Sequence, residues 1–419
     1  MIKILNARDT TAIDRLAAHD AARDPKIMRA AARIVAAVRA TGDDALTAYA
    51  TRFDLLRGPL EMTRNEIEVG AARAGRDVRD AIRTAVRNVR TVAARQLPKS
   101  FTVSPMKGIG IEQRVTPLAR VGCYVPAGRF PLPSSLIMSV VPARVAGVED
   151  VIVVCPHPSD AVLAAAVEAG ATRLFRIGGA HAIAALAYGT ATVPAVQRIT
   201  GPGNAYVSAA KAIVSAHCPI DFNAGPSEIV VISDEGNAEW IAADLIAQAE
   251  HDPDARAIFI TTSKALAAGV AGAIERRLPA NTSDSAIRTA LARRGGIVIM
   301  PSREAAIGLV NRIAPEHAVC DDDRTARALT TSGTIFVGGW SAQAAGDYAT
   351  GSNHILPTGG AARVRGGLSA ADFVKVTAVQ RLTAAGLRGI SPAAIALAEA
   401  EGLTAHADSI RARSEGTRR

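Results

Sequence analysis

Aromatic side chains are scarce in this sequence, at 4% of its 419 residues, and no dense basic block is interleaved with them. Proteins that hold single-stranded nucleic acid combine a basic groove with aromatic rings on which bases stack. The net charge is +9 and the pI is about 9.8, but the arginines are spread over expected helices and the C-terminal tail. We interpret the charge as solvated helix faces that could attract anionic metabolites, and we expect no nucleic-acid partner.

Cysteine is also sparse, and segments that would direct the chain to a membrane are missing. Cys123, Cys155, Cys218 and Cys320 form no C-x-x-C pair, which suits free thiols in a reducing compartment. No charge-free apolar run reaches the roughly 20 residues of a membrane span. The first residues lack the long apolar segment of a signal peptide. We therefore expect a cytoplasmic protein without membrane contact.

Several common active-site fingerprints are absent. No G-x-G-x-x-G follows a strand pattern, and there is no Walker phosphate loop, no H-E-x-x-H and no G-x-S-x-G. Serine-based hydrolysis therefore has no support. A dinucleotide, if one binds, would have to bind without the usual glycine-rich turn.

The residues that are abundant are aliphatic, and they recur in alternating helix and strand patterns. Hydrophobic residues make up 49% of a chain that is longer than a single core usually supports. Strand, helix and strand in succession indicate parallel sheets. We predict an α/β fold with two open, mostly parallel-sheet lobes, each incomplete and Rossmann-like, plus a helical N-terminal region and a helical C-terminal tail.

The boundaries of these parts are placed where the patterns change. We expect residues 1–117 to form a mainly helical region that packs on the second lobe, followed by a first lobe at 118–228 and a second lobe at 229–365. Residues 366–419 would form the helical tail, in which Ser391 and Pro392 suit the cap and first residue of a helix. In the second lobe we expect strands at 229–232, 257–261, 296–300 and 334–337.

One expected helix ends in polar groups that the helix itself does not need. Gln248 and His251 fall in its last turn, before Pro253, and their spacing of three places them on one face. An amide oxygen and an imidazole nitrogen could then point at one metal ion. Asp347 and His406 stand in similarly unusual places and would complete a set of nitrogen and oxygen ligands. The alternative is that the pair only caps carbonyls at the helix end.

A carboxylate and an imidazole stand side by side at Glu316 and His317, just after an expected helix. A histidine with a pKa near neutrality can take a proton from an alcohol, and a carboxylate can activate water. Those are the two tasks needed to oxidise an alcohol through an aldehyde to an acid. The alternative is a solvated Glu316 beside a His317 that packs at the edge of a lobe.

Taken together, several separate motifs resemble those of the histidinol dehydrogenase family, in the same order and at similar separations. They are Gly201–Ala205, Ala224–Glu228, Gln248–His251, Pro315–His317, Ala345–Tyr348, Asn353–Pro357 and Glu401–His406. The resemblance implies two successive NAD-dependent oxidations, from L-histidinol via histidinal to L-histidine, the last step of histidine biosynthesis.

The resemblance also implies roles for matching residues. Gln248, His251, Asp347 and His406 would hold one zinc ion per subunit, and the zinc would grip the imidazole and amino nitrogens of the substrate. His317 would be the base for the alcohol proton, and Glu316, the second catalytic residue, would activate the water that attacks the aldehyde. The substrate contacts would come from Ser134, Ser227, Gln248, His251, His317, Asp347, His354, Glu401 and His406.

For the cofactor and the partner subunit, the resemblance implies NAD on the first lobe and a homodimer. Tyr124, His181 and Asn204 match NAD-binding positions. Family members exchange their C-terminal tails, so Glu401 and His406 would serve the active site of the other subunit.

Two departures from the family pattern concern the cofactor. His181 stands where many members have glutamine, and Ala127 replaces a usual glycine. The metal and Glu-His motifs are intact. Two alternatives stay open: a related dehydrogenase of another small alcohol, such as a sulfonated diol, and a catalytically silent zinc protein that binds a metabolite.

Overall fold

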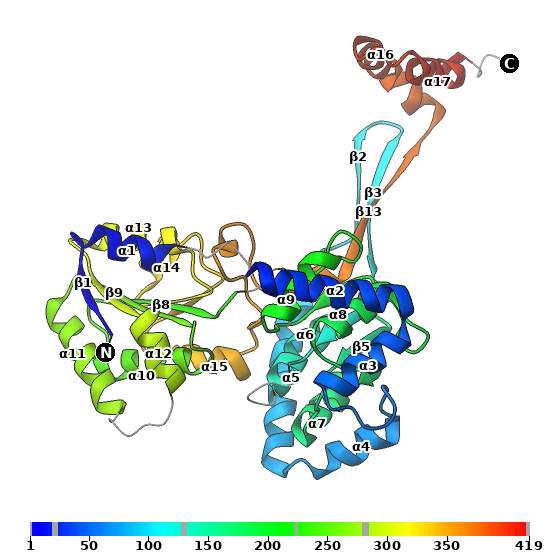
Figure 1. The fold of residues 1–419 in the computed structure, drawn as a ribbon. Coiled ribbons are helices and arrows are strands. Elements are labelled where there is room, and N and C mark those ends of the chain that lie inside the picture. The colour runs from blue at the N-terminus through cyan, green and yellow to red at the C-terminus, as the bar shows by residue number, and fades with distance from the viewer. Residues whose placement is uncertain (1, 19–23, 127–131, 223–224, 279–284, 416–419) are drawn as a thin grey trace. The chain divides into compact units, whose positions relative to one another are not determined.

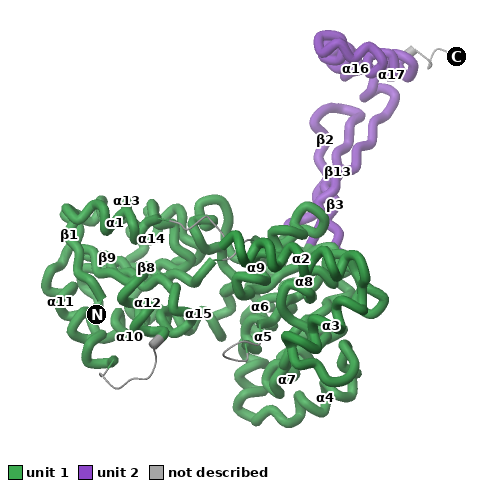
Figure 2. The backbone as a smooth tube through the Cα atoms, viewed as in Figure 1, with its two compact units in different colours: residues 1–96, 119–373 green, residues 97–118, 374–419 purple. Residues whose placement is uncertain are grey.

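The computed structural model describes residues 2–18, 24–126, 132–222, 225–278 and 285–415. The chain divides into two compact units (Figure 2). The first unit comprises Met1–Gln96 and Ala119–Phe373, and the second comprises Leu97–Leu118 and Val374–Arg419. No helix in these described ranges is long and apolar enough to cross a membrane.

The first lobe of the first unit is a parallel sheet with the strand order β6-β5-β4-β7. Its β-branched strands are buried because helices pack against the sheet, and Ser159 caps one of these helices by accepting a hydrogen bond from the Val162 amide. The strands are β4 (Arg120–Tyr124), β5 (Asp150–Val154), β6 (Arg173–Phe175) and β7 (Ile199–Thr200). The helices are α6 (Pro133–Val145), α7 (Asp160–Ala169), α8 (Gly179–Tyr188) and α9 (Ala205–Val214).

The second lobe is a parallel sheet with the strand order β1-β10-β9-β8-β11-β12. Figure 1 labels β1, β9 and β8 of this sheet. Its strands are β1 (Ile4–Asn6), β8 (Glu228–Ile232), β9 (Arg256–Thr261), β10 (Gly296–Ile299), β11 (His317–Cys320) and β12 (Thr334–Val337). Its helices are α1 (Thr10–Ala17), α10 (Ala238–Glu250), α11 (Lys264–Arg277), α12 (Ser285–Arg293), α13 (Arg303–Ile313), α14 (Asp323–Ala328) and α15 (Gln343–Tyr348). Two 3-10 helices follow, η1 (Ala361–Arg363) and η2 (Ala370–Phe373).

The two lobes share one topological feature. In each, the first strand lies between its successor and a strand that comes later in the chain: β4 between β5 and β7, and β8 between β9 and β11. The strand order therefore reverses beside β4 and beside β8, and in open parallel sheets such reversals form crevices at the carboxyl ends of the strands. The predicted fold class, α/β with mostly parallel sheets, is confirmed.

The N-terminal helices correct one expectation. They are α2 (Pro25–Thr41), α3 (Asp43–Phe53), α4 (Arg64–Arg73) and α5 (Arg76–Gln96). The expectation that residues 1–117 pack on the second lobe is wrong for these helices, which contact α6, α7, α8 and α9 of the first lobe. The reason is the apolar stripe of α2, since Val35 and Val38 are buried in the same core as Leu186. Among the described N-terminal elements, β1 and α1 are the ones that pack on the second lobe, β1 against β10 and α1 against α13.

The second unit contains an antiparallel sheet of order β13-β3-β2 and two helices. Its elements are β2 (Phe101–Met106), β3 (Ile109–Pro117), β13 (Val374–Leu382), α16 (Ala384–Ala400) and α17 (Thr404–Glu415). The tail is therefore not wholly helical, because β13 precedes the helices. The helix start expected at Ser391 and Pro392 is also wrong: Thr383 caps α16 through the Gly386 amide, and Pro392 lies inside the helix.

Candidate active site

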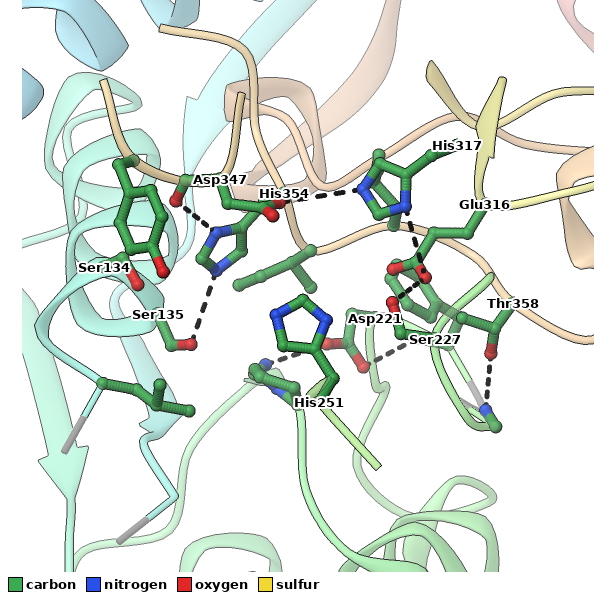
Figure 3. A pocket seen from close by; sticks show the side chains of 18 of the residues that line it. Ser134, Ser135, Asp221, Ser227, His251, Glu316, His317, Asp347, His354 and Thr358 are labelled. Atoms are coloured by element: carbon green, nitrogen blue, oxygen red, sulfur yellow. Dashed lines mark hydrogen bonds and ion pairs between the residues drawn. The ribbon is translucent and has the colours of Figure 1, made fainter. Parts of the chain in front are cut away.

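A cavity of about 210 Å³ lies in the first unit and is lined by polar groups from both lobes (Figure 3). The first lobe contributes residues that follow β7 and residues at the start of α6, whereas the second lobe contributes residues at the amino ends of β8 and β11. The polar side chains that line it belong to Ser134, Ser135, Lys211, Asp221, Ser227, His251, Glu316, His317, Asp347, Tyr348, His354 and Thr358.

Glu316 lines this cavity and is buried, with 6% of its surface exposed. Its Oε2 accepts hydrogen bonds from the Ser227 hydroxyl at 2.5 Å and from the Glu228 amide at 2.9 Å. Burial raises the pKa of Glu316 to about 8, with a further contribution from the negative charge of Asp347, while the two hydrogen bonds oppose the rise. A carboxyl group with such a pKa is a stronger base than a solvated one.

His317 is 3% exposed, and its hydrogen bonds define its tautomer. Nδ1 lies 3.0 Å from the backbone carbonyl oxygen of Glu228. Because a carbonyl can only accept, Nδ1 carries the proton, and the lone pair is left on Nε2. Nε2 has no hydrogen-bond partner among the described residues and lies 3.7 Å from Oδ1 of Asp347. Burial lowers the pKa of His317, so the imidazole is neutral and can accept a proton.

His354 and Asp347 form a second pair beside His317. His354 donates from Nδ1 to the backbone carbonyl of Asp347 at 2.7 Å, so its Nε2 is the acceptor that faces the Ser135 hydroxyl at 3.4 Å. The Asp347 carboxylate accepts a hydrogen bond from the Gln343 amide at 2.8 Å. In Figure 3 the imidazoles of His317 and His354 and that of His251 converge on one space.

The Gln248 side chain is buried without a hydrogen-bond partner in the described part of the chain, which suits a metal ligand. Its side chain is 0% exposed, and neither Oε1 nor Nε2 has a hydrogen-bond partner among the described residues. An unsatisfied buried amide costs about 1–3 kcal/mol, so a group that binds its oxygen would be stabilising. His251 caps the same helix and lines the cavity, although Gln248 itself does not line it.

His, Cys, Asp and Glu side chains alone do not form a metal site in the ranges that the structure describes. Within those ranges, no cluster of three or more His, Cys, Asp or Glu side chains is arranged to hold a metal ion. The predicted set includes an amide, Gln248, and places His406 in the second unit, where it is exposed on α17. Glu401 is also exposed in that unit, at the end of α16.

The residues predicted to contact NAD lie around two turns of the first lobe, and they do not line the cavity. Tyr124 is buried, and its hydroxyl accepts a hydrogen bond from the Gly179 amide at 3.1 Å. Asn204 caps α9 through two backbone amides. His181 is buried, with Nε2 2.7 Å from Asp54, the C-cap of α3, so its imidazole faces the core. This orientation does not support a direct contact between that imidazole and a dinucleotide. Ala127 lies outside the described residues.

Sequence reasoning missed an ion pair that shapes the wall of the cavity. Lys211 and Asp221 are buried and paired, and both bind Gly201: the Lys211 ammonium donates to its carbonyl at 2.9 Å, and Asp221 accepts from its amide at 2.8 Å. Gly201 has φ +112°, and a Cβ there would lie 2.1 Å from the Tyr124 carbonyl oxygen, so no other residue fits. A lysine in the otherwise apolar stretch 205–214 was the available signal.

Comparisons with known proteins point to one family over nearly the whole chain. The sequence model of the histidinol dehydrogenase family matches residues 18–414. The chain is 43% identical over 423 residues to the histidinol dehydrogenase of Aromatoleum aromaticum, covering 97% of each protein. It is 45% identical to that of Gluconobacter oxydans, covering 91% of each. The crystal structure of histidinol dehydrogenase from Elizabethkingia anophelis superposes with a TM-score of 0.94 at 30% identity, covering 99% of this chain and 98% of that one.

Proposed function

This chain belongs to the histidinol dehydrogenase family, and from that premise we propose that it oxidises L-histidinol via histidinal to L-histidine, using two molecules of NAD and one zinc ion. The observation that carries the proposal is the pairing of a neutral His317 and a buried Glu316 in one cavity. The role in amino-acid biosynthesis fits the cytoplasmic location expected from the sequence.

The two side chains suit the two half-reactions. In the first, Nε2 of His317 takes the hydroxyl proton of the alcohol while a hydride leaves the same carbon. In the second, Glu316 takes a proton from the water that adds to the aldehyde, and the hydrate then loses a second hydride and a proton. NAD would accept each hydride, so one histidinol, one water and two NAD would give one histidine, two NADH and three protons.

The proposed zinc ligands of this subunit are Gln248, His251 and Asp347, and the unpartnered amide of Gln248 supports the assignment. Zinc would supply a fixed anchor for the imidazole and amino nitrogens of the substrate. Ser134, Ser227 and His354 are available around that anchor as substrate contacts. The proposed NAD site is the crevice after β4 and β7, where the strand order of the first lobe reverses.

The second unit supports the proposed homodimer. β2 is exposed along its whole length, and the sheet with the two helices exposes large apolar side chains. They belong to Phe101, Val103, Met106, Val376, Leu382, Leu397 and Leu403. A small sheet of this kind is stable when a partner covers it. We propose that a second copy does so and that Glu401 and His406 enter the active site of that copy.

The charge of the cavity favours histidinol over an anionic alcohol. Among the described residues that line it, Lys211 is the single lysine or arginine, and its charge is paired with Asp221. A sulfonate would therefore find no unpaired lysine or arginine there, whereas an imidazole and an ammonium would find carboxylates.

The test is to supply zinc-loaded protein with NAD and either histidinol or a sulfonated diol. Two NADH per histidinol, lost on treatment with a chelator, would support the proposal. Turnover of the sulfonated diol without turnover of histidinol would move the function to the related dehydrogenases.

A further inference from the structure

The second lobe carries a pocket that the proposed reaction does not use. It lies at the carboxyl ends of β8 and β11, whereas Ser227, Glu316 and His317 stand at the amino ends of the same strands. Strands of this length separate the two places by roughly 15 Å. β8 and β11 are the neighbours between which the strand order reverses, and open parallel sheets bind ligands beyond the carboxyl ends at such a reversal.

The charge of this pocket is negative. Asp244 and Asp321 line it, and no lysine or arginine is among its described lining residues. Asp321 already has partners, because it accepts a hydrogen bond from the Asp234 amide and lies 3.5 Å from Arg303. Asp244 is half-buried on α10, and no described residue donates a hydrogen bond to it or forms an ion pair with it. A partly buried carboxylate without a partner is stabilised by a cation.

One tryptophan, Trp240, lines this pocket with Asp244, and a second, Trp340, packs against the ring of Trp240. The indole rings of Trp240 and Trp340 lie 5.2 Å apart at an angle of 50°, and the two residues are 44% and 91% exposed. Trp240 precedes Asp244 by one helical turn, and Trp340 lies in the segment after β12. The face of an indole ring attracts cations more strongly than that of any other side chain.

The size of the pocket limits what it can hold. Its volume is about 40 Å³, which excludes a dinucleotide and admits only the charged end of an ammonium, with the rest of the ligand outside the pocket. The acidic loop after β8, with Asp234 and Glu235, would also repel phosphate.

We propose that this pocket binds an organic ammonium, a protonated or quaternary amine, with its charge between Asp244 and Trp240 and its apolar body against Trp340. The face of α10 that carries Trp240 and Asp244 continues to Gln248 at the same interval of four residues, so the ligand would contact the helix that ends at the active site. The inference concerns binding alone and does not rest on the proposed reaction.

Intrinsic fluorescence tests this proposal directly, because Trp240 and Trp340 are the two tryptophans of the chain. The full-length protein is titrated with tetramethylammonium chloride in place of sodium chloride at constant ionic strength, since exposed charges are screened by salt. Neutral tert-butanol, which has a similar size, is the control ligand. We expect a saturable change with the cation and none with the alcohol.

Variants then locate the binding site. Asp244→Asn should weaken tetramethylammonium binding roughly tenfold. Trp340→Leu changes a side chain that is almost fully exposed, so folding is unaffected, and it should weaken binding several-fold while Trp240 still reports. Asp323→Asn, which removes an exposed charge outside the pocket, should leave binding unchanged.

Two results would overturn the proposal. One is a titration in which tetramethylammonium acts no differently from sodium or tert-butanol, or binds equally well to Trp340→Leu. The other is fluorescence that depends on protein concentration but not on the cation, which would assign the tryptophan pair to a contact between copies of the chain.

Discussion

His317 donates a hydrogen bond from Nδ1 to the backbone carbonyl of Glu228, 3.0 Å away, and this bond leaves Nε2 as the basic nitrogen. The amide of the same Glu228 donates to Glu316. One peptide segment at the start of β8 therefore orients both proposed catalytic side chains. The roles predicted for His317 and Glu316 depend on these two hydrogen bonds.

Replacing the base should abolish turnover without releasing the metal. In His317→Gln, the amide cannot take the alcohol proton, so kcat should fall by about 10²–10⁴-fold. Zinc content, measured by atomic emission, should match that of the unchanged protein, because His317 is not a proposed ligand. Loss of zinc together with activity would show that His317 acts on the metal site instead.

Replacing the carboxylate should separate the two oxidations. Glu316→Gln preserves the shape and can still accept hydrogen bonds from Ser227 and Glu228, so the fold should persist. The amide cannot deprotonate water, and therefore oxidation of added histidinal should slow by about 10²-fold or more. The first hydride transfer, followed in a single turnover, should slow less. Equal loss in both steps would contradict the division of roles.

The Gln248 amide should matter for the metal more than for the fold. Gln248→Ala should weaken zinc binding at least about tenfold, judged by competition with a chelator. Glu275→Ala, an exposed change on α11, is the control and should bind zinc normally. Unchanged zinc affinity in Gln248→Ala would remove that residue from the ligand set.

Sharing of active sites can be tested with two defective chains. A His406→Ala chain and a Glu316→Gln chain should each be inactive, and mixing them under conditions of subunit exchange should restore about one quarter of the activity, because half the dimers carry one intact site. Mixing the Glu316→Gln chain with a His317→Gln chain is the control. Each cavity takes both Glu316 and His317 from its own chain, so every cavity of the mixed dimer keeps one defect. Restoration in the control, or none in the first mixture, would contradict exchange of the tails.

The buried carboxyls predict how stability changes with pH. Burial raises the pKa of Glu228 to about 7 and that of Glu316 to about 8. Since the folded chain then holds protons that the unfolded chain releases near its ordinary pKa, the stabilisation is complete below about pH 4.5 and is lost as the pH rises through 7 to 8. The Tm of metal-free protein should therefore fall between pH 5 and pH 8.5, because unfolding releases protons in this range.

Two substitutions check the origin of that pH dependence. Glu316→Gln should flatten the fall in Tm, because it removes one of the two groups. Glu239→Gln should not, because the Glu239 side chain is 43% exposed and hydrogen bonds from Arg276 and Arg277 lower its pKa. A Tm that rises over this range would contradict the assignment.

Local sequence signals were sufficient for much of the fold. The strands expected at 229–232, 257–261, 296–300 and 334–337 correspond to β8, β9, β10 and β12, because β-branched runs bounded by turns are a local signal. β11 was missed because only one of its four residues, Val319, is β-branched, so the segment lacks the strand signal of its neighbours. β13 was missed because its stability comes from pairing with β3, which lies more than 250 residues earlier in the chain.

Some residues of the active site could likewise be predicted from the sequence, and others could not. Glu316 and His317 could be identified because adjacent polar groups in an apolar stretch are visible in the sequence. The Lys211–Asp221 pair and the contact of Ser135 with His354 could not, because folding alone brings them together. The orientation of His181 was missed for the same reason, since Asp54 lies 127 residues earlier in the chain, at the end of α3.

The most direct measurement is a crystal structure of the protein loaded with zinc and histidinol, with the metal located by anomalous scattering. We predict one ion bound by Gln248, His251 and Asp347 of one subunit and His406 of the other, and Nε2 of His317 within hydrogen-bonding distance of the substrate hydroxyl. An ion bound elsewhere, or a His406 remote from the cavity in both subunits, would contradict the proposal.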